Sequence, residues 1–309
     1  MLKKNKILFI SGPTNSGKSK LAMEIANRFN GEIINADSMQ VYNELKILTA
    51  RPSKNDEKNI KHHLYGHIKG SQRYNVYDWC NDCKIKIQKI INLDKFPIIV
   101  GGTGLYFHSL IKGMAKIPKI PESIKRKSKL RLEEIGLNNF IDEINNMDKG
   151  SLKKINKNDS QRLKRLWEVM TFSGIPLSQW QNNAKEKFIK NYNYNLILIL
   201  PDKEILKKKC DKRFLRMIDD GAIKEVKKLK EKNYDQELPI MKAHGVPELI
   251  RYTDGALNLQ EAIKEAQKST RKYIKRQLTW WRGSEIKADK IFDSFPLNID
   301  LNSLKIEKN

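Results

Sequence analysis

The chain has 309 residues, 39% of them hydrophobic, which is enough for a sizeable core and one or two domains. No apolar run is long enough to cross a bilayer, and three cysteines do not make a disulfide framework, so we expect a cytoplasmic protein with no membrane partner. Sixty Lys and Arg residues against 36 Asp and Glu give a formal charge of +24, which attracts polyanions such as nucleic acid, although a lysine-rich composition bias would give the same number.

The first expected element is a β-strand at residues 7–11, an apolar run that is too short for a signal peptide. A helix should follow, because Leu21, Ile25 and Phe29 recur every four residues and form one buried face. Between them, GPTNSGKS matches the G-x-x-x-x-G-K-[ST] phosphate-binding loop in its required place, after a strand and opening a helix.

This loop predicts a phosphate site built largely from backbone N–H groups, which the helix dipole reinforces. Lys18 would reach a terminal phosphate, and the Ser19 hydroxyl would help to hold Mg²⁺. The pattern leaves the reaction open. The residues assigned to phosphate binding are Gly12, Pro13, Thr14, Asn15, Ser16, Gly17, Lys18 and Ser19.

Three more strands are expected at residues 32–37, 96–102 and 195–201, each an apolar run. Because helical stretches separate them, the chain should form an α/β fold, a P-loop type parallel sheet flanked by helices, with a helical insertion domain. Asp37 and Ser38 end the second strand, at the edge where such sheets bind ligands. Asp37 could be a general base, a magnesium partner or a helix N-cap. Thr103 offers a hydroxyl after the third strand, in what could also be an ordinary turn.

Residues 117–191 are expected to form the helical insertion, and residues 1–116 and 192–309 the P-loop core with C-terminal helices. The insertion opens with IPKIP, a stiff linker. Within it, Asn158 or Asp159 could cap a helix that presents Gln161, Arg162 and Arg165.

A C-terminal helix over residues 269–283 carries the clearest charge pattern. Ile274, Leu278 and Trp281 share one face, at positions i, i+4 and i+7. Arg271, Lys275 and Arg282 share another face, with Lys272 and Arg276 beside it. Such a stripe suits a phosphate backbone, and its indole rings could stack on bases, although a solvated face is the alternative. The last fifteen or so residues should be loosely held.

Taken in order, these segments resemble one family, the tRNA dimethylallyltransferases. The resemblance runs collinearly over about residues 7–285, and its motifs are GPTNSGKS, ADSMQVY, TARP, HHLYGH, GGTGLYF, IPKIP, NDSQRLKR, RFLRM and KRQLTWWRG. It implies transfer of a dimethylallyl group from dimethylallyl diphosphate to N6 of the adenosine immediately 3′ of the anticodon, in tRNAs that read codons beginning with U.

The resemblance also implies residue roles. Asp37 would be the general base, and Lys18 and Arg213 would act on the diphosphate, with Mg²⁺ as the cofactor. Together with the C-terminal stripe, it places tRNA contacts at Asp37, Ser38, Met39, Gln40, Thr103, Lys125, Gln161, Arg162, Leu163, Lys164, Arg165, Lys275, Arg276, Gln277, Trp280 and Arg282. It further implies that the insertion, residues 117–191, contacts the tRNA anticodon region and that the other two segments form the catalytic core. We expect a monomer that binds the tRNA anticodon stem-loop.

Three residues depart from the family pattern. Leu48 stands where a glycine is common, Gly66 where many relatives have aspartate, and Lys125 where arginine is common. Three alternatives remain: a P-loop kinase with ATP in the loop, a prenyltransferase acting on free adenine nucleotides, and a nucleic-acid-binding module without catalysis.

Overall fold

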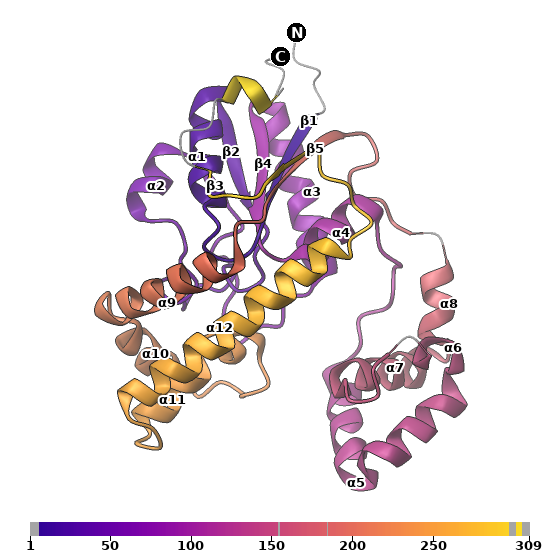
Figure 1. Cartoon of the computed structure of the whole chain (residues 1–309). Coiled ribbons are helices and arrows are strands. Elements are labelled where there is room, and N and C mark those ends of the chain that lie inside the picture. Colours follow the sequence, from indigo (N-terminus) through magenta and orange to yellow (C-terminus); the bar gives the residue numbers. More distant parts are fainter. Residues whose placement is uncertain (1–5, 154, 184, 297–300, 305–309) are drawn as a thin grey trace. The chain divides into compact units, whose positions relative to one another are not determined.

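The computed structural model describes residues 6–153, 155–183, 185–296 and 301–304, which fall into two compact units (Figure 1). The core unit comprises the residues up to Leu110 and from Phe188, and the helical unit comprises Ile111–Lys187. The insertion was predicted at 117–191. In the structure the helical unit begins and ends a few residues earlier, at Ile111 and Lys187. Met114 and Glu186 exchange two backbone hydrogen bonds, N···O 3.1 and 2.8 Å, which tie the two chain passages together inside the helical unit.

The core unit contains a parallel six-stranded sheet with the order β3-β2-β4-β1-β5-β6. The four predicted strands are present as β1, β2, β4 and β5. The other two were missed because they have only two and three residues and no long apolar run. The bounds are β1 Lys6–Ser11, β2 Gly31–Asn35, β3 His62–His63, β4 Phe96–Gly101, β5 Asn193–Ile199 and β6 Lys290–Phe292.

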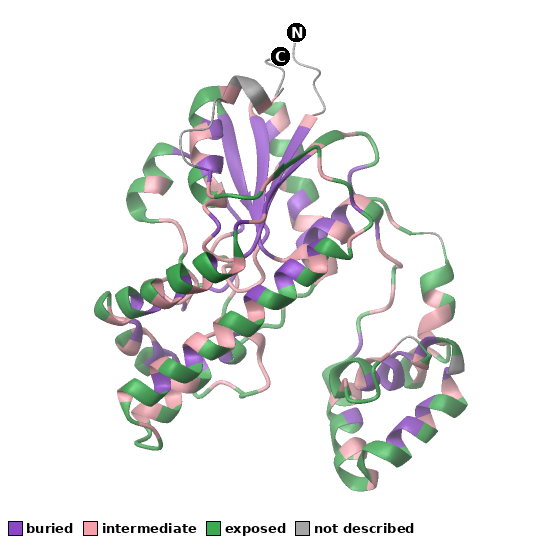
Figure 2. Ribbon diagram, in the orientation of Figure 1, coloured by how far each residue is buried: buried purple, intermediate pink, exposed green. Residues whose placement is uncertain are grey.

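Both faces of this sheet are buried, as Figure 2 shows by the colour of its central strands. Leu8 and Ile10 pack in a cluster with the apolar face of α1 (Lys18–Phe29). On the opposite face Phe9 meets Phe107, with ring centroids 5.7 Å apart. Alternating residues of one strand thus serve two layers, as the predicted fold requires.

Helices from both ends of the sequence complete the core unit. A second apolar cluster joins the C-terminal helices to Val41, Tyr42 and Leu45, which follow β2. This cluster extends the molecule beyond the carboxyl ends of the strands. The bounds are α2 Lys54–Asn59, α3 Val76–Asn92, α4 Gly104–Lys112, α9 Lys203–Asp219, α10 Ala222–Lys230, η1 Pro239–Lys242, α11 Val246–Thr253, α12 Leu259–Arg282 and η2 Leu301–Leu304.

The helical unit has its own core, in which Phe140, Leu163 and Trp167 are buried. Its elements are α5 Glu122–Met147, α6 Lys149–Leu152, α7 Ser160–Ser173 and α8 Leu177–Asn182. Asp159 caps α7 by accepting a hydrogen bond from the Arg162 amide, which confirms one of the two predicted caps.

The end of the chain departs from its expectation. Leu301 and Leu304 pack against the α1 cluster, so this part of the chain is held by apolar contacts. Residues 297–300 and 305–309, which were also expected to be loose, lie outside the described residues. In the described part of the chain, no helix is both long enough and apolar enough to span a membrane.

Candidate active site

The phosphate-binding loop joins β1 to α1, and its backbone has the shape that the motif predicts. Gly17 has φ 91°, a left-handed conformation that glycine adopts without strain, and α1 begins at the next residue. At the other end of the loop, the carbonyl oxygen of Ile199 lies so close to Gly12 that no Cβ would fit. The helix N-terminus therefore points its amide groups at the space that the loop encloses.

This loop lines a cavity of about 250 Å³, which we call the phosphate cavity. Lys18 donates a hydrogen bond from Nζ to the Pro13 carbonyl, 3.0 Å away. Burial lowers the pKa of Lys18 to about 8, with Asp37 opposing the shift and Arg213 adding to it. Outside the loop, the cavity is lined by Lys20, Asp37, Gln40, Thr49, Ala50, Tyr65, Val100, Gly101 and Arg213.

Arg213 reaches the loop from α9, far along the chain. Its Nη2 donates to Thr14 Oγ1 at 2.6 Å, and burial lowers the pKa of its guanidinium. From the same helix, the Cys210 thiol contacts the Thr14 carbonyl at 3.7 Å. The structure thus brings together the two cations, Lys18 and Arg213, that the sequence assigned to the diphosphate.

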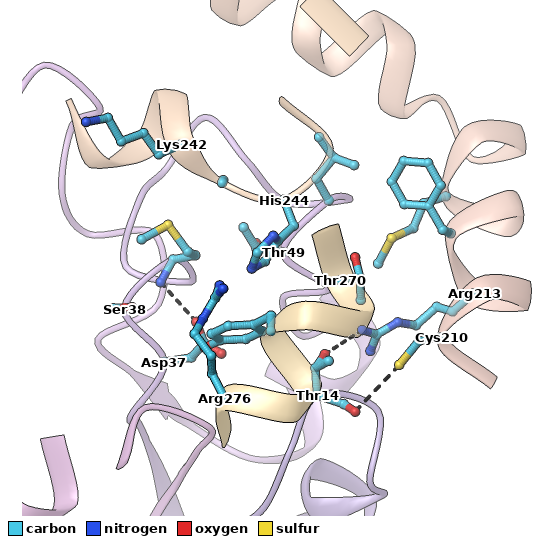
Figure 3. A pocket seen from close by; sticks show the side chains of 16 residues that line it. Thr14, Asp37, Ser38, Thr49, Cys210, Arg213, Lys242, His244, Thr270 and Arg276 are labelled. Atoms are coloured by element: carbon cyan, nitrogen blue, oxygen red, sulfur yellow. Dashed lines mark hydrogen bonds between the residues drawn. The ribbon is translucent and has the colours of Figure 1, made fainter. Parts of the chain in front are cut away.

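A second cavity of about 210 Å³, which we call the acceptor cavity, lies beside the first (Figure 3). Four residues line both cavities: Thr14, Asp37, Thr49 and Arg213. The remaining wall of the acceptor cavity is formed by Ser38, Met39, Leu48, Cys210, Phe214, Met217, Lys242, Ala243, His244, Thr270, Tyr273 and Arg276. A group held in the phosphate cavity can therefore meet a second molecule beside the Asp37 carboxylate.

Asp37 is held in position by hydrogen bonds at its backbone and at its carboxylate. Asn35 Oδ1 accepts from the Asp37 amide at 2.9 Å, and Asn35 Nδ2 donates to the carbonyls of Asp37 and Leu64, both at 3.0 Å. Asp37 Oδ1 accepts from the Met39 amide at 2.9 Å. The helix-cap reading of Asp37 is wrong, because residues 37–53, all of them described, contain no helix. Sequence reasoning missed Asn35, although a polar residue inside an apolar strand was a usable signal.

The segment 46–51 forms the wall between the two cavities and is fixed from two directions. The carboxylate of Glu225, on α10, accepts from the amides of Lys46, Ile47 and Leu48 at 2.6, 2.8 and 3.0 Å. The side-chain Nε2 of Gln40 donates to the carbonyls of Thr49 and Ala50 at 2.8 and 3.0 Å. Nothing in the sequence singled out Glu225, which is one acid among many on charged helices.

The C-terminal helix is α12, and its predicted buried face is confirmed for Ile274, Leu278 and Trp281. Arg276 lines the acceptor cavity, while Lys275 and Arg282 are exposed. On this helix Trp280 packs so closely on Gly104 that a Cβ there would overlap its ring.

Gln277, on α12, was predicted to contact tRNA, and its side chain has a second role in the structure. It is 5% exposed, accepts from the Thr14 amide at 2.9 Å and donates to the Gly102 carbonyl at 2.8 Å. It therefore ties the phosphate-binding loop to the turn after β4, and its contact with tRNA stays a prediction. In that turn, Thr103 Oγ1 accepts from the Ser38 amide at 3.0 Å, which brings two predicted tRNA contacts together.

In the helical unit, the predicted contacts divide by exposure. Leu163 has no exposed surface and packs in the core of the unit, so the prediction that it contacts tRNA is wrong for its side chain. A helix presents only part of its circumference to solvent, and the sequence stretch was carried over whole. Gln161 and Arg162 are exposed, whereas Lys164 and Arg165 are half-buried. Lys125 pairs with Glu122, N···O 3.0 Å.

Two of the departures from the family pattern also lie near the cavities. Leu48 lines the acceptor cavity. Gly66 has φ 53°, and the Arg51 guanidinium occupies the space that its side chain would need. An aspartate at this position would therefore require Arg51 to move.

Two family models and several known proteins match this chain. The IPP transferase family model matches residues 40–284, and the isopentenyl transferase family model matches residues 5–66. The chain is 41% identical over 280 residues to the tRNA dimethylallyltransferase of Ehrlichia chaffeensis, covering 90% of this chain and 91% of the relative. It is 40% identical over 312 residues to that of Pelagibacter ubique, covering 100% and 99%.

Solved structures agree as well. The full-length tRNA isopentenylpyrophosphate transferase of Bacillus halodurans superposes with a TM-score of 0.67 at 28% identity, over 97% of this chain and 93% of that chain. A eukaryotic dimethylallyltransferase acting on tRNA superposes with a TM-score of 0.74 at 28% identity, over 89% and 69%. The fold, the phosphate-binding loop and these matches together mean that this chain belongs to the IPP transferase family.

Proposed function

We propose that this protein is a tRNA dimethylallyltransferase, which moves the dimethylallyl group of dimethylallyl diphosphate to N6 of the adenosine 3′-adjacent to the anticodon. The observation that carries this proposal is the junction of the two cavities at Thr14, Asp37, Thr49 and Arg213. One cavity offers phosphate ligands, and the other is open to a second substrate beside a carboxylate. A P-loop kinase would also use a phosphate cavity beside an acceptor carboxylate, so the family match favours prenyl transfer over that alternative.

The phosphate cavity suits a leaving group. As the allylic C–O bond breaks, its electrons pass to the diphosphate while positive charge grows on the carbon. The loop amides, Lys18 and Arg213 surround the space where that negative charge develops. Fixed donors in a half-buried site stabilise developing charge more effectively than water does.

The acceptor side needs a base, because the lone pair of the adenine N6 amine is delocalised into the ring. As the new C–N bond forms, Asp37 takes one proton from the amine, so the product nitrogen stays neutral. The Asp37 amide donates to Asn35 Oδ1 and the carboxylate accepts from the Met39 amide, and together these bonds fix the position of the carboxylate. Transfer then consumes one diphosphate ester and one amine, and yields the alkylated amine, diphosphate and a protonated Asp37.

The oxygen donors of the phosphate cavity fit Mg²⁺, a hard cation that prefers oxygen ligands. Ser19, with its hydroxyl, and Asp37, with its carboxylate, both line this cavity. In the described part of the chain, no group of three or more His, Cys, Asp or Glu side chains could hold a metal by itself. We therefore propose that Ser19 holds Mg²⁺ together with the diphosphate oxygens, where the ion would neutralise charge on the leaving group.

For the RNA, we propose that the exposed cations of α12 and α7 bind the anticodon stem-loop. We also propose that the protein acts as a monomer in the cytoplasm. Sedimentation of the protein with and without tRNA tests the monomer.

Mass spectrometry of tRNA nucleosides tests the proposed function. The protein is incubated with dimethylallyl diphosphate, Mg²⁺ and unmodified tRNA, and parallel reactions replace tRNA with AMP or the prenyl donor with ATP. We expect N6-dimethylallyladenosine at one position of the tRNA. Alkylated AMP without modified tRNA would support the free-nucleotide prenyltransferase, and phosphate release from ATP with unmodified tRNA would support the kinase.

A further inference from the structure

His244 lies in the short connection Ala243–Gly245, between η1 and α11, and its side chain points into the acceptor cavity (Figure 3). The backbone on both sides of it is fixed. The Val246 amide donates to the Ala243 carbonyl at 2.9 Å, and the Gly245 amide donates to Glu248 Oε2 at 3.1 Å. The imidazole is therefore presented to the cavity from a rigid turn.

The ring orientation of His244 is set by α12. Nδ1 lies 2.9 Å from Ser269 Oγ, and the ring lies tilted against Tyr273, with centroids 4.7 Å apart and planes at 44°. Among the described residues, the other ring nitrogen, Nε2, has no hydrogen-bond partner. A half-buried polar edge held in one orientation is suited to bind a group that enters the cavity.

The imidazole is neutral at physiological pH. Burial lowers the pKa of His244 to about 4; the nearby Arg276 adds to this shift, and Asp37 opposes it. A neutral imidazole carries one N–H donor and one lone pair. When the Ser269 hydroxyl donates to Nδ1, the proton lies on Nε2, which then donates toward the cavity.

The acceptor cavity is lined by two chemically different sets of side chains. Met39, Leu48, Phe214 and Met217 are apolar and suit a hydrocarbon. His244, Tyr273 and Arg276 are polar or aromatic, and the latter two lie on α12. A purine needs partners for its ring nitrogens when it leaves water, whereas a prenyl group does not.

We propose that His244 is a specificity-determining residue that donates a hydrogen bond from Nε2 to a ring nitrogen of the acceptor adenine. This inference rests on the proposed function and assigns a partner to the purine edge. N1, N3 and N7 of adenine are all acceptors, so each can take this bond. N1 of guanine carries a proton, and a contact at that atom would reject guanine.

Atomic substitution in the RNA tests the proposal. Anticodon stem-loops carry adenosine, 1-deaza-, 3-deaza- or 7-deazaadenosine at the acceptor position, and kcat/KM is measured for the wild-type protein and for His244→Phe. The phenyl ring keeps the aromatic shape without a donor. We expect one deaza substitution to lower kcat/KM about tenfold in the wild type and to have little further effect in the variant.

Changing a ring nitrogen also alters the reactivity of N6. The informative quantity is therefore the fold loss of kcat/KM on each deaza loop in the wild type, divided by the same loss in His244→Phe. His244→Gln, whose amide can donate from a similar position, should recover part of the loss, and His244→Asn, which is shorter, should not. The proposal is overturned if the losses from deaza substitution and from His244→Phe multiply for all three analogues. It is also overturned if His244→Phe reacts like the wild type. Transfer by the wild type to the adenosine loop separates these outcomes from failure of the proposed function, in which no loop is modified.

Discussion

Asp37 is held in place on both sides: the Asn35 side chain bonds its backbone, and its carboxylate accepts a hydrogen bond from the Met39 amide. A base that is already positioned needs little reorganisation when the substrate arrives, which is a main source of catalytic rate. The same residue lines both cavities. At the scale of single residues, the chemistry should therefore depend on Asp37 much more than RNA binding does.

Asp37→Asn should lower kcat by about 10²–10⁴-fold, because the amide cannot take the N6 proton. The dissociation constant of tRNA should change little, since the cationic helix is untouched. Single-turnover transfer and filter binding measure the two quantities. Asp235→Asn is the matched control, because exposed Asp235 also accepts a backbone hydrogen bond from the residue two positions ahead. Equal losses of binding and transfer would contradict the assigned role.

Because of Lys18, we expect binding of the diphosphate in the phosphate cavity to depend on pH. Its pKa of about 8 means that the free enzyme loses this positive charge as pH rises through 8, and diphosphate binding favours the charged form. Affinity for dimethylallyl diphosphate should therefore be full below pH 8. Above it, KM should rise by up to about tenfold per pH unit. Lys18→Arg keeps its charge over this range, so the same rise in that variant would exclude Lys18 as its cause.

At the scale of elements, α10 acts on the site through the segment 46–51 without touching either cavity. The carboxylate of Glu225 accepts hydrogen bonds from three backbone amides of this segment. Leu48 and Thr49, which this contact positions, line the acceptor cavity. Glu225 is thus a positioning residue for the wall between the cavities.

Glu225→Gln should lower kcat/KM about tenfold, because a neutral amide makes weaker hydrogen bonds and its NH₂ group opposes one of the three donors. KM for the prenyl donor should rise more than kcat falls if the wall moves. Steady-state kinetics and thermal unfolding separate this effect from a general loss of stability. Glu231→Gln, an exposed acid one residue beyond α10, should leave both unchanged. Similar effects of the two substitutions would argue against the positioning role.

Helix α12 connects the two functions of the core unit. Gln277 is hydrogen-bonded to the phosphate-binding loop, and the exposed cations Lys275 and Arg276 directly precede it in the helix. Lys275→Gln with Arg276→Gln should weaken tRNA binding and reduce the slope of log K against log salt by about 1–2. Binding isotherms at several salt concentrations measure this slope. Lys84→Gln with Lys89→Gln, which removes two exposed charges from α3, should leave the slope unchanged.

At the scale of the whole molecule, two units with separate cores share the assigned RNA contacts. Arg162→Gln with Lys164→Gln should weaken tRNA binding about three- to tenfold and leave KM for the prenyl donor unchanged. Thermal unfolding should not change either, because the buried face of α7, with Leu163 and Trp167, is intact. Unchanged tRNA affinity would remove the helical unit from the RNA-binding surface.

The sequence alone determined the local parts of this protein. Four strands, the phosphate-binding loop, the position of Asp37 at a strand end and the buried face of α12 follow from patterns only a few residues long. Such patterns are readable because a strand repeats every two residues and a helix every 3.6. The resemblance added Arg213, whose neighbours in the sequence carry no comparable signal.

Only the tertiary structure decided which side chains meet. Thr14 forms hydrogen bonds with Arg213 and Gln277, which lie on two helices far along the chain. Segment 46–51 forms hydrogen bonds with Glu225 on a third helix. A charged helix offers many equivalent candidates, and packing selects one of them by bringing it within hydrogen-bond distance. Packing also removed Leu163 from the RNA-binding set by burying it, and it brought Gln277 to the phosphate-binding loop. Burial and long-range contact are properties of the folded chain, because they depend on which surfaces the cores cover.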